Sequence, residues 1–209
     1  MKTIFYILLP LMVMSASIFY SKASATGERG GALSEHKALV VFYSRSGQNY
    51  VSGDIVNLPV GNTAAVAEII RQKIGADVFE IKTVKPYPAD YHETTEVAKK
   101  ELNEQARPDI VGGVDDIAQY DTIILGYPNW WGTMPMAVRS FLDAHDLAGK
   151  TILPFCTHEG SGMGRSEKDL KSALPSCIMK PGLAIKGSRV HRRDSGIPAE
   201  VEAWLNKNL

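Results

Sequence analysis

Short apolar runs alternate with segments of helical periodicity along residues 37–209, and this alternation restricts the chain to few folds. Apolar runs of this length favour β-strands, and apolar residues that recur every three or four positions favour helices. Strands that alternate with helices form a parallel sheet covered on both faces. We therefore expect one doubly wound α/β domain. The predicted strands span 38–43, 77–83, 121–127, 151–157 and 182–187, and the predicted helices 62–75, 90–106, 134–144, 165–174 and 198–209.

Residues 1–25 have the pattern of a secretory signal peptide. A lysine follows the first methionine, residues 4–20 are apolar, and Ala23-Ser24-Ala25 is a small-x-small cleavage site. We expect an exported protein, periplasmic or otherwise extracytoplasmic. The alternative is an uncleaved membrane anchor at 4–20, because the run is close to the shortest that spans a bilayer. Residues 26–36 are polar and glycine-rich and are predicted to form a flexible leader before the domain at 37–209.

The charges of the chain are balanced, with 23 basic and 23 acidic residues. Loss of residues 1–25 removes two lysines and no acid, which leaves a formal charge of about −2. A balance of this kind gives no electrostatic reason to expect a nucleic acid or an anionic membrane surface as partner. After signal cleavage, no membrane span is expected.

The chain has two cysteines, Cys156 and Cys177. An even number in an exported protein suggests a disulfide. The predicted sheet argues against this pairing, because Cys156 would end its strand at the carboxyl edge and Cys177 would precede the next strand at the opposite edge. A strand of this length spans roughly 17–20 Å, whereas a disulfide needs Cα atoms within about 7 Å. We predict two free, mostly buried thiols.

Three loops with polar and glycine-rich sequences follow predicted strands, at the edge where parallel α/β sheets bind ligands. The first loop contains "YSRSG" and, further along, "GNT". Ser44, Ser46, Asn62 and Thr63 offer hydroxyls and an amide, Gly47 allows a sharp turn, and the helix that follows presents free N–H groups. These groups suit a terminal monophosphate. The alternative is plain capping of the helix.

The second loop is "GYPNWWGTMP", residues 126–135. Two adjacent tryptophans in a strand-to-helix loop are difficult to place in a core, and one of them would stack well on a flat ring. Gly132 leaves the backbone free to approach such a ring. The alternative is that Trp130 and Trp131 cap the hydrophobic core.

The third loop is "CTHEGSGMG", residues 156–164. Thr157, Ser161 and the glycines form a segment whose backbone can bond the edge of a planar heterocycle. His158 is either an acid or base at the site or an exposed loop histidine.

With these three loops, the sequence resembles the flavodoxin family over about residues 37–205. "YSRSG…GNT" looks like the family's phosphate loop, and "GYPNWWGTMP" and "THEGSG" match its two flavin loops. The resemblance implies a five-stranded parallel sheet in the order 2-1-3-4-5 and FMN as the cofactor. It implies a phosphate site at Ser44, Arg45, Ser46, Gly47, Asn62 and Thr63, one flavin side at Pro128, Asn129, Trp130, Trp131 and Gly132, and another flavin edge at Thr157, Glu159, Gly160 and Gly162.

Residues 48–61 depart from the simplest family pattern, in which "SRSG" runs directly into "NT". Two short β-like pieces around Ser52-Gly53-Asp54 predict a small hairpin inserted into the phosphate loop. A hairpin returns the chain close to its start, and the cost of closing a loop grows slowly with length. We therefore expect phosphate binding to survive, with Gln48 or Asn49 as alternatives to Asn62 at the phosphate. Arg45 is expected at the rim, where it would soften the phosphate charge.

The resemblance implies electron transfer through bound FMN to a redox partner protein. The first alternative is an FMN-dependent NAD(P)H reductase that acts on a small quinone-like or nitro substrate, which the nearly neutral charge favours. The second is an exported binding module that has lost its flavin. No side chain is assigned a catalytic role, and no metal site is predicted.

Overall fold

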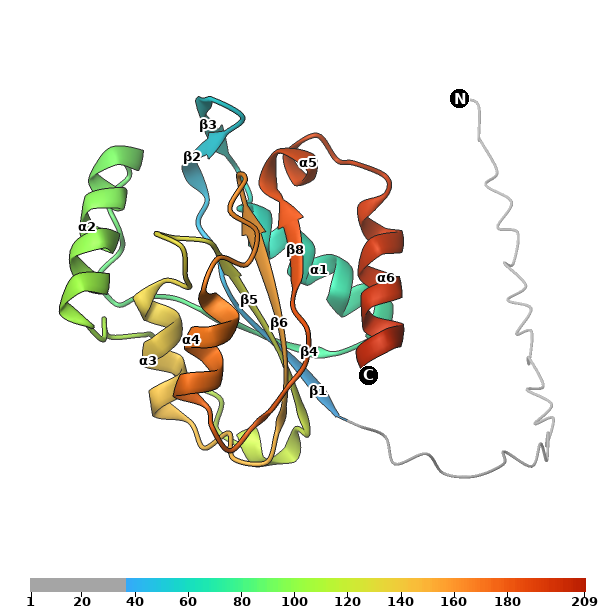
Figure 1. The fold of residues 1–209 in the computed structure, drawn as a ribbon. Helices are drawn as coiled ribbons and strands as arrows, with labels where there is room; N and C mark the ends of the chain where they lie inside the picture. Colours follow the sequence, from blue (N-terminus) through green and yellow to red (C-terminus); the bar gives the residue numbers. More distant parts are fainter. Residues whose placement is uncertain (1–36) are drawn as a thin grey trace, which may run out of the picture. The chain divides into compact units, whose positions relative to one another are not determined.

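The computed structural model describes residues 37–209 and shows an α/β domain with a mostly parallel sheet (Figure 1). The predicted signal peptide at 1–25, the leader at 26–36 and the alternative anchor at 4–20 lie outside the described residues. Among the described residues, no helix has the length and apolar character needed to cross a membrane. The strands of the main sheet are β1 (Ala38–Tyr43), β4 (Asp77–Ile81), β5 (Thr122–Pro128), β6 (Thr151–His158), β7 (Ile178–Met179) and β8 (Leu183–Lys186).

The strand order is β4-β1-β5-β6, with β7 and β8 both paired to β6, and every pairing in this sheet is parallel. The expected order 2-1-3-4-5 is confirmed, with one difference in detail. The fifth position is divided into two short strands rather than the single run predicted at 182–187. Pro181 lies between them, and a proline has no N–H to donate to a strand ladder. The carbonyl of Pro181 instead accepts a hydrogen bond from Trp204 Nε1 at 2.9 Å.

Helices cover both faces of the sheet, as predicted (Figure 1). One core contains β-strand residues packed against α3 and α4, and the other contains residues packed against α1 and α6. The polar helix α2 lies beside α3 and contacts β2. The helices are α1 (Asn62–Ile74), α2 (Tyr91–Glu104), α3 (Met136–Ala144), α4 (Ser166–Ala173), α5 (Gly187–His191) and α6 (Ile197–Asn208), with a short 3-10 turn at Ile117–Gln119.

Helix α1 shows how local sequence sets the position of a helix that reaches the site. Val66, Ala67 and Ile70 recur at helical spacing and are buried against the sheet. Gly75 ends the helix in the left-handed conformation, and its N–H donates to Arg71 O. The first turn of α1 lies at the carboxyl edge of the sheet, since Ala64 N donates to Ser44 Oγ directly after the end of β1.

A second, two-stranded sheet is the predicted hairpin. It consists of β2 (Gly47–Val51) and β3 (Asp54–Leu58), which pair in antiparallel register. Ser52 and Gly53 form the turn, and both have positive φ, as a two-residue hairpin turn with the native twist requires. That this hairpin is an insertion relative to simpler family members stays a prediction.

The two cysteines are free, as predicted. Cys156 is buried near the carboxyl end of β6. Cys177 is half-buried and directly precedes β7, and its thiol donates to Leu147 O at 2.9 Å. The parallel register therefore places the two cysteines at opposite edges of the sheet, as predicted.

We expect both thiols to react slowly in the native protein, and Cys156 more slowly than Cys177. Burial raises the pKa of the Cys156 thiol to about 12, and burial also raises the pKa of Cys177. Since the thiolate is the reactive form, alkylation at pH 8 should label Cys177 first and Cys156 only on unfolding. Timed iodoacetamide labelling with peptide mass spectrometry measures this order. Rapid labelling of Cys156 in the native protein would contradict this order. A protein mass lower by two hydrogens would indicate a disulfide and would contradict the free thiols.

Candidate functional site

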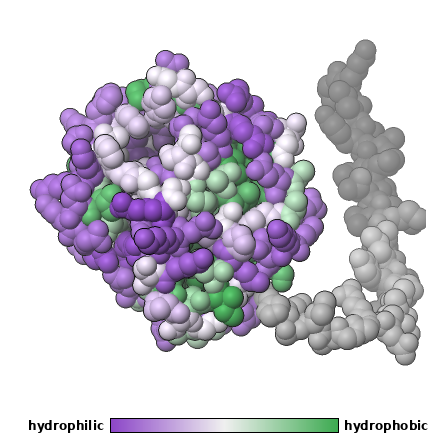
Figure 2. All heavy atoms as spheres, viewed as in Figure 1, coloured by the Kyte–Doolittle hydropathy of each residue, from purple (hydrophilic) through white to green (hydrophobic). Residues whose placement is uncertain are grey.

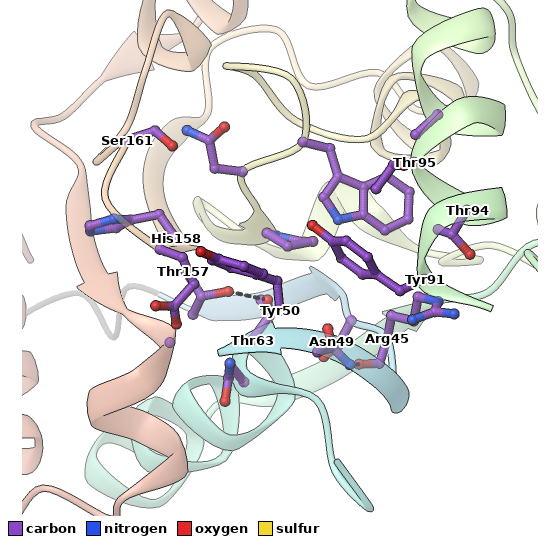
Figure 3. Close-up of a pocket in the computed structure, with 18 of the residues that line it drawn as sticks. Arg45, Asn49, Tyr50, Thr63, Tyr91, Thr94, Thr95, Thr157, His158 and Ser161 are labelled. Atoms are coloured by element: carbon purple, nitrogen blue, oxygen red, sulfur yellow. Dashed lines mark hydrogen bonds between the residues drawn. The ribbon is translucent and has the colours of Figure 1, made fainter. Parts of the chain in front are cut away.

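A cavity of about 490 Å³ lies at the carboxyl edge of the sheet (Figure 3). The three loops singled out in the sequence all contribute to it, together with the hairpin, the first turns of α1 and α2, and Gly187 at the start of α5. The cavity has a polar end near α1 and an aromatic part beside the second loop. Its lining includes one basic side chain, Arg45, and one acidic side chain, Glu159, besides His158.

The polar end is built on the N-terminus of α1. Gly61 occupies the N-cap position without a side chain, and Ser44 Oγ accepts a hydrogen bond from Ala64 N at 3.0 Å instead. Ser44, which directly follows β1, therefore caps the helix, and the amides of Asn62 and Thr63 begin the helix beside it. Such amides have no intrahelical partners and carry the positive end of the helix dipole, which favours an anion.

Thr63 and Thr157 connect the polar end to the third loop. Their hydroxyls lie 2.7 Å apart and both side chains are buried, although the two residues come from different elements. Both line the cavity. This hydroxyl pair fixes the start of α1 against the end of β6.

Asn129 holds the second and third loops together. Its backbone N–H donates to Thr157 O at 2.8 Å, its side-chain amide donates to Gly162 O at 2.9 Å, and its Oδ1 accepts from Gly132 N at 3.0 Å. Gly132 and Gly162 thus bond to Asn129 through their backbone atoms, and neither glycine lines the cavity. The loop backbone is held in position before any ligand binds.

The two tryptophans of the second loop have different environments. Trp130 is half-buried, packs on the core, and makes edge contacts with Tyr43 and Tyr87 at centroid distances of 5.4 and 5.1 Å. Trp131 is 46% exposed, and its Nε1 donates to Thr95 O at 2.9 Å. Trp130 thus packs against the hydrophobic core, as the alternative interpretation of this loop expected. Both tryptophans also line the cavity.

Trp131 and Gly132 form a tight turn in which both residues have positive φ. Trp130 and Thr133 close the turn with two backbone hydrogen bonds, at 2.8 and 3.1 Å. A tryptophan in this conformation is strained, at a cost on the order of 1–3 kcal/mol. The bond to Thr95 and the Lys99 ammonium, 4.9 Å from the Trp131 ring centroid, help to hold it there.

Glu159 lies near the polar end, next to Gly187. Its Oε2 accepts from Ser52 N, at the tip of the hairpin, at 3.4 Å. Its Oε1 is buried and has no hydrogen-bond partner among the described residues. An unpaired buried carboxylate oxygen is costly, so a donor from a ligand would be favourable here.

His158 lies in the lining of the cavity and is half-buried. Its Nδ1 accepts a hydrogen bond from Gly160 N at 2.9 Å, which leaves Nε2 to carry the proton. Burial lowers the pKa of His158, so the neutral form is favoured at pH 7. Gly160 acts here through its backbone, outside the lining of the cavity.

A sequence profile of the flavodoxin family matches residues 55–208. This match covers more than half of the chain. The chain belongs to the flavodoxin family. The predicted family and fold are therefore confirmed.

Solved structures similar to this flavodoxin-family chain agree with its fold. A protein from Bacteroides eggerthii described as a flavoprotein is 30% identical, with a TM-score of 0.65, over 82% of this chain and 97% of its own. Another, from Bacteroides uniformis, is 26% identical, with a TM-score of 0.62, over 81% and 97%. A flavoprotein from Lactobacillus acidophilus, crystallised in complex with FMN, is 22% identical, with a TM-score of 0.56, over 75% and 97%.

The cavity brings together ten of the fifteen residues that the sequence singled out. Ser46 and Gly47 line a neighbouring cavity, under the base of the hairpin, and three glycines lie outside the lining. The ten are Ser44, Arg45, Asn62, Thr63, Pro128, Asn129, Trp130, Trp131, Thr157 and Glu159. Sequence reasoning did not assign Tyr50, Tyr91, Thr94, Thr95, Ala98 and Gly187 to the site, and it left Asn49, His158 and Ser161 without a settled role there.

Arg45 has a different role from the one expected at the rim. Its guanidinium donates to the backbone carbonyls of Gln48, Pro88 and Ala89, the last two at 2.7 and 2.8 Å. Three of its five N–H groups therefore bond to the backbone between the hairpin and the start of α2. Asn49 likewise donates to the carbonyls of Arg45 and Gly47, at 3.1 and 3.0 Å, and so shapes the loop.

Proposed function

We propose that this flavodoxin-family protein binds FMN in the cavity at the carboxyl edge and transfers electrons through it. The observation that carries the proposal is the continuity of the cavity, from the N-terminus of α1 to the aromatic second loop. An anion is favoured at the first end and a flat ring at the second. The volume lies within the usual range for small-molecule sites, about 300–1,000 Å³.

The residues present fit the parts of FMN. The Ser44 and Thr63 hydroxyls and the first amides of α1 suit the phosphate. The unpartnered Oε1 of Glu159 suits a hydroxyl donor, which the ribityl chain offers several times over. Trp130 and Trp131, with Pro128, suit the isoalloxazine ring.

Bound FMN would supply the redox chemistry, and the chain would bind, orient and shield it. Asn129 fixes the backbone of the second and third loops, so that their amides and carbonyls are positioned before the cofactor arrives. His158 presents a protonated Nε2 as a hydrogen-bond donor rather than a second cation.

The phosphate end can be tested by replacing Ser44 with alanine. The wild-type protein should bind one FMN, with quenched flavin fluorescence. Ser44→Ala should weaken FMN binding by roughly tenfold or more, because a hydrogen bond to a charged group contributes about 1.5–3 kcal/mol. Riboflavin, which lacks the phosphate, should bind both proteins equally. Fluorescence titration with the two flavins measures these affinities.

Ser46→Ala is the matched control, since Ser46 lines the neighbouring cavity. It should retain most of the FMN affinity. Equal losses in both variants, or equal losses for FMN and riboflavin, would contradict the assignment of Ser44 to the phosphate. A wild-type protein that ignores FMN would favour the binding-module alternative.

An FMN-dependent NAD(P)H reductase is the second candidate function. The balanced charge favours it, because a carrier that docks on a basic partner gains from a strongly acidic surface. On the face drawn in Figure 2, hydrophilic and hydrophobic residues are interspersed in small areas. Rapid anaerobic bleaching of the bound flavin by NADPH or NADH would support the reductase. Bleaching by dithionite alone would support the carrier.

A further inference from the structure

The hairpin β2–β3 lies between α2 and α5 (Figure 1). Two of its residues, Asn49 and Tyr50, line the cavity. The hairpin is firmly attached on the α2 side. Arg45 links the backbone of the hairpin to the loop before α2, through the carbonyls of Gln48, Pro88 and Ala89. Gln48 Oε1 also accepts from Tyr91 N, at the start of α2, at 2.9 Å. These bonds fix where the side chains of β2 point.

The opposite end of the hairpin reaches the third loop. Ser52, in the turn of the hairpin, donates its backbone N–H to Glu159 Oε2 at 3.4 Å. This bond is long and exposed, in contrast with the short bonds on the α2 side. The hairpin is thus held by several short hydrogen bonds on the side of α2 and by one long hydrogen bond at the third loop.

Tyr50 occupies the space between these two attachments. It projects from β2 into the lining of the cavity, towards the third loop (Figure 3). Its ring lies in a stacked arrangement with Tyr91, at a centroid distance of 6.3 Å and an angle of 27°. The side chain is 42% exposed, so its position is not explained by burial in the hydrophobic core.

The third loop has no Phe, Tyr or Trp between Thr157 and Gly164, and its one ring is the imidazole of His158. The tryptophans of the second loop are both held by other groups, Trp130 by the core and Trp131 by Thr95. On the side of the third loop, a flat ligand in the cavity would therefore have no Phe, Tyr or Trp ring beside it, unless the hairpin supplies one. Tyr50 is placed to do so.

We propose that Tyr50, which the hairpin supplies, contacts the flavin ring and is an FMN-positioning residue. This inference rests on the proposed FMN site. Its mechanism is contact between the flat phenol and the flat isoalloxazine, which aromatic rings favour in offset or edge geometry. The hairpin then contributes to holding the ring part of the cofactor, in addition to connecting the two halves of the phosphate loop.

The test compares Tyr50→Ala, Tyr50→Phe and Ile55→Ala in the full-length protein. Ile55 is the cross-strand partner of Tyr50 and is 40% exposed, and it lies outside the lining of the cavity. Tyr50→Ala should weaken the binding of FMN and of riboflavin by the same factor, about tenfold. It should also speed FMN dissociation and change the absorption spectrum of bound flavin. Tyr50→Phe and Ile55→Ala should stay within about twofold of wild type.

The riboflavin arm separates a ring contact from a phosphate contact, because Ser44→Ala should affect FMN alone. If the wild-type protein binds FMN and the Tyr50→Ala variant binds flavins equally well, this inference is overturned and the proposed function is left intact. An equal loss in Ile55→Ala would also overturn it, since hairpin stability would then be the cause. Failure of the wild type to bind FMN would overturn both. Thermal unfolding of the apo variants checks that each remains folded.

Discussion

Replacing Gly61 with alanine is expected to reduce FMN affinity by about 100-fold or more and to destabilise the apo protein. Gly61 has ordinary negative φ, so its backbone conformation does not require glycine. The space around it does. A Cβ at this position would lie 2.3 Å from Ser44 Oγ and 2.5 Å from Arg45 O. The first loop would have to move away from α1, and two or more bonds to the phosphate, each contributing about 1.5–3 kcal/mol, would be lost.

The destabilisation of the Gly61→Ala protein should be about 1–3 kcal/mol, the usual cost of inserting a methyl group into a packed site. Urea unfolding of the apo protein and fluorescence titration with FMN measure the two effects. Val60→Ala is the control, since Val60 is adjacent and 59% exposed. It should leave both quantities close to wild type. A Gly61→Ala protein with normal FMN affinity would show that the contact of the first loop with α1 does not form the phosphate site.

Replacing Gly126 with alanine is expected to lower the free energy of unfolding by about 3 kcal/mol. Gly126 lies in the central strand β5, directly opposite Phe155 of β6. The ring of Phe155 is fully buried and covers Gly126, so that a Cβ would lie 2.0 Å from the ring carbon Cζ. Strand β5 contributes to both cores, and the Phe155 ring belongs to the core formed with α1 and α6, so neither can move without disturbing packed residues. The melting temperature should fall by roughly 6–12 °C in a domain of this size.

A second variant, Gly126→Ala with Phe155→Leu, tests the cause. The smaller leucine leaves room for the new methyl group, so the double variant should be more stable than the sum of the two single changes predicts. Thermal and urea unfolding of the four proteins measure this coupling. Additive effects would contradict a direct clash between residue 126 and the Phe155 ring.

Local sequence was sufficient to predict the sheet and its loops. Strand and helix periods depend on residues close together in the chain, and parallel connections then allow few strand orders. The same reasoning located the hairpin, through Ser52-Gly53, and the separation of Cys156 from Cys177. It also found the residues of the polar end, because Ser44 and Thr63 adjoin a strand end and a helix start.

The division of roles within the site could not be read from the sequence. Trp130 and Trp131 are chemically identical neighbours, and only the packing of Tyr43, Tyr87 and Thr95 around them makes one a core residue and the other an exposed one. Arg45 was assigned to the rim because its charge suits a phosphate. Its guanidinium is occupied by carbonyls from a loop more than forty residues away.

The sequence by itself determined the α/β class and the three loops at the carboxyl edge, because these follow from local pattern. Its motifs carry the resemblance to the family, and that resemblance implies the strand order. Only the tertiary structure decided that Ser46 and Gly47 line a neighbouring cavity and that Tyr91, on a polar helix, lines this one. The tertiary structure also placed Tyr50 in the lining of this cavity. Such facts depend on contacts between segments far apart in the chain, whose geometry is set by packing and not by the period of any one segment.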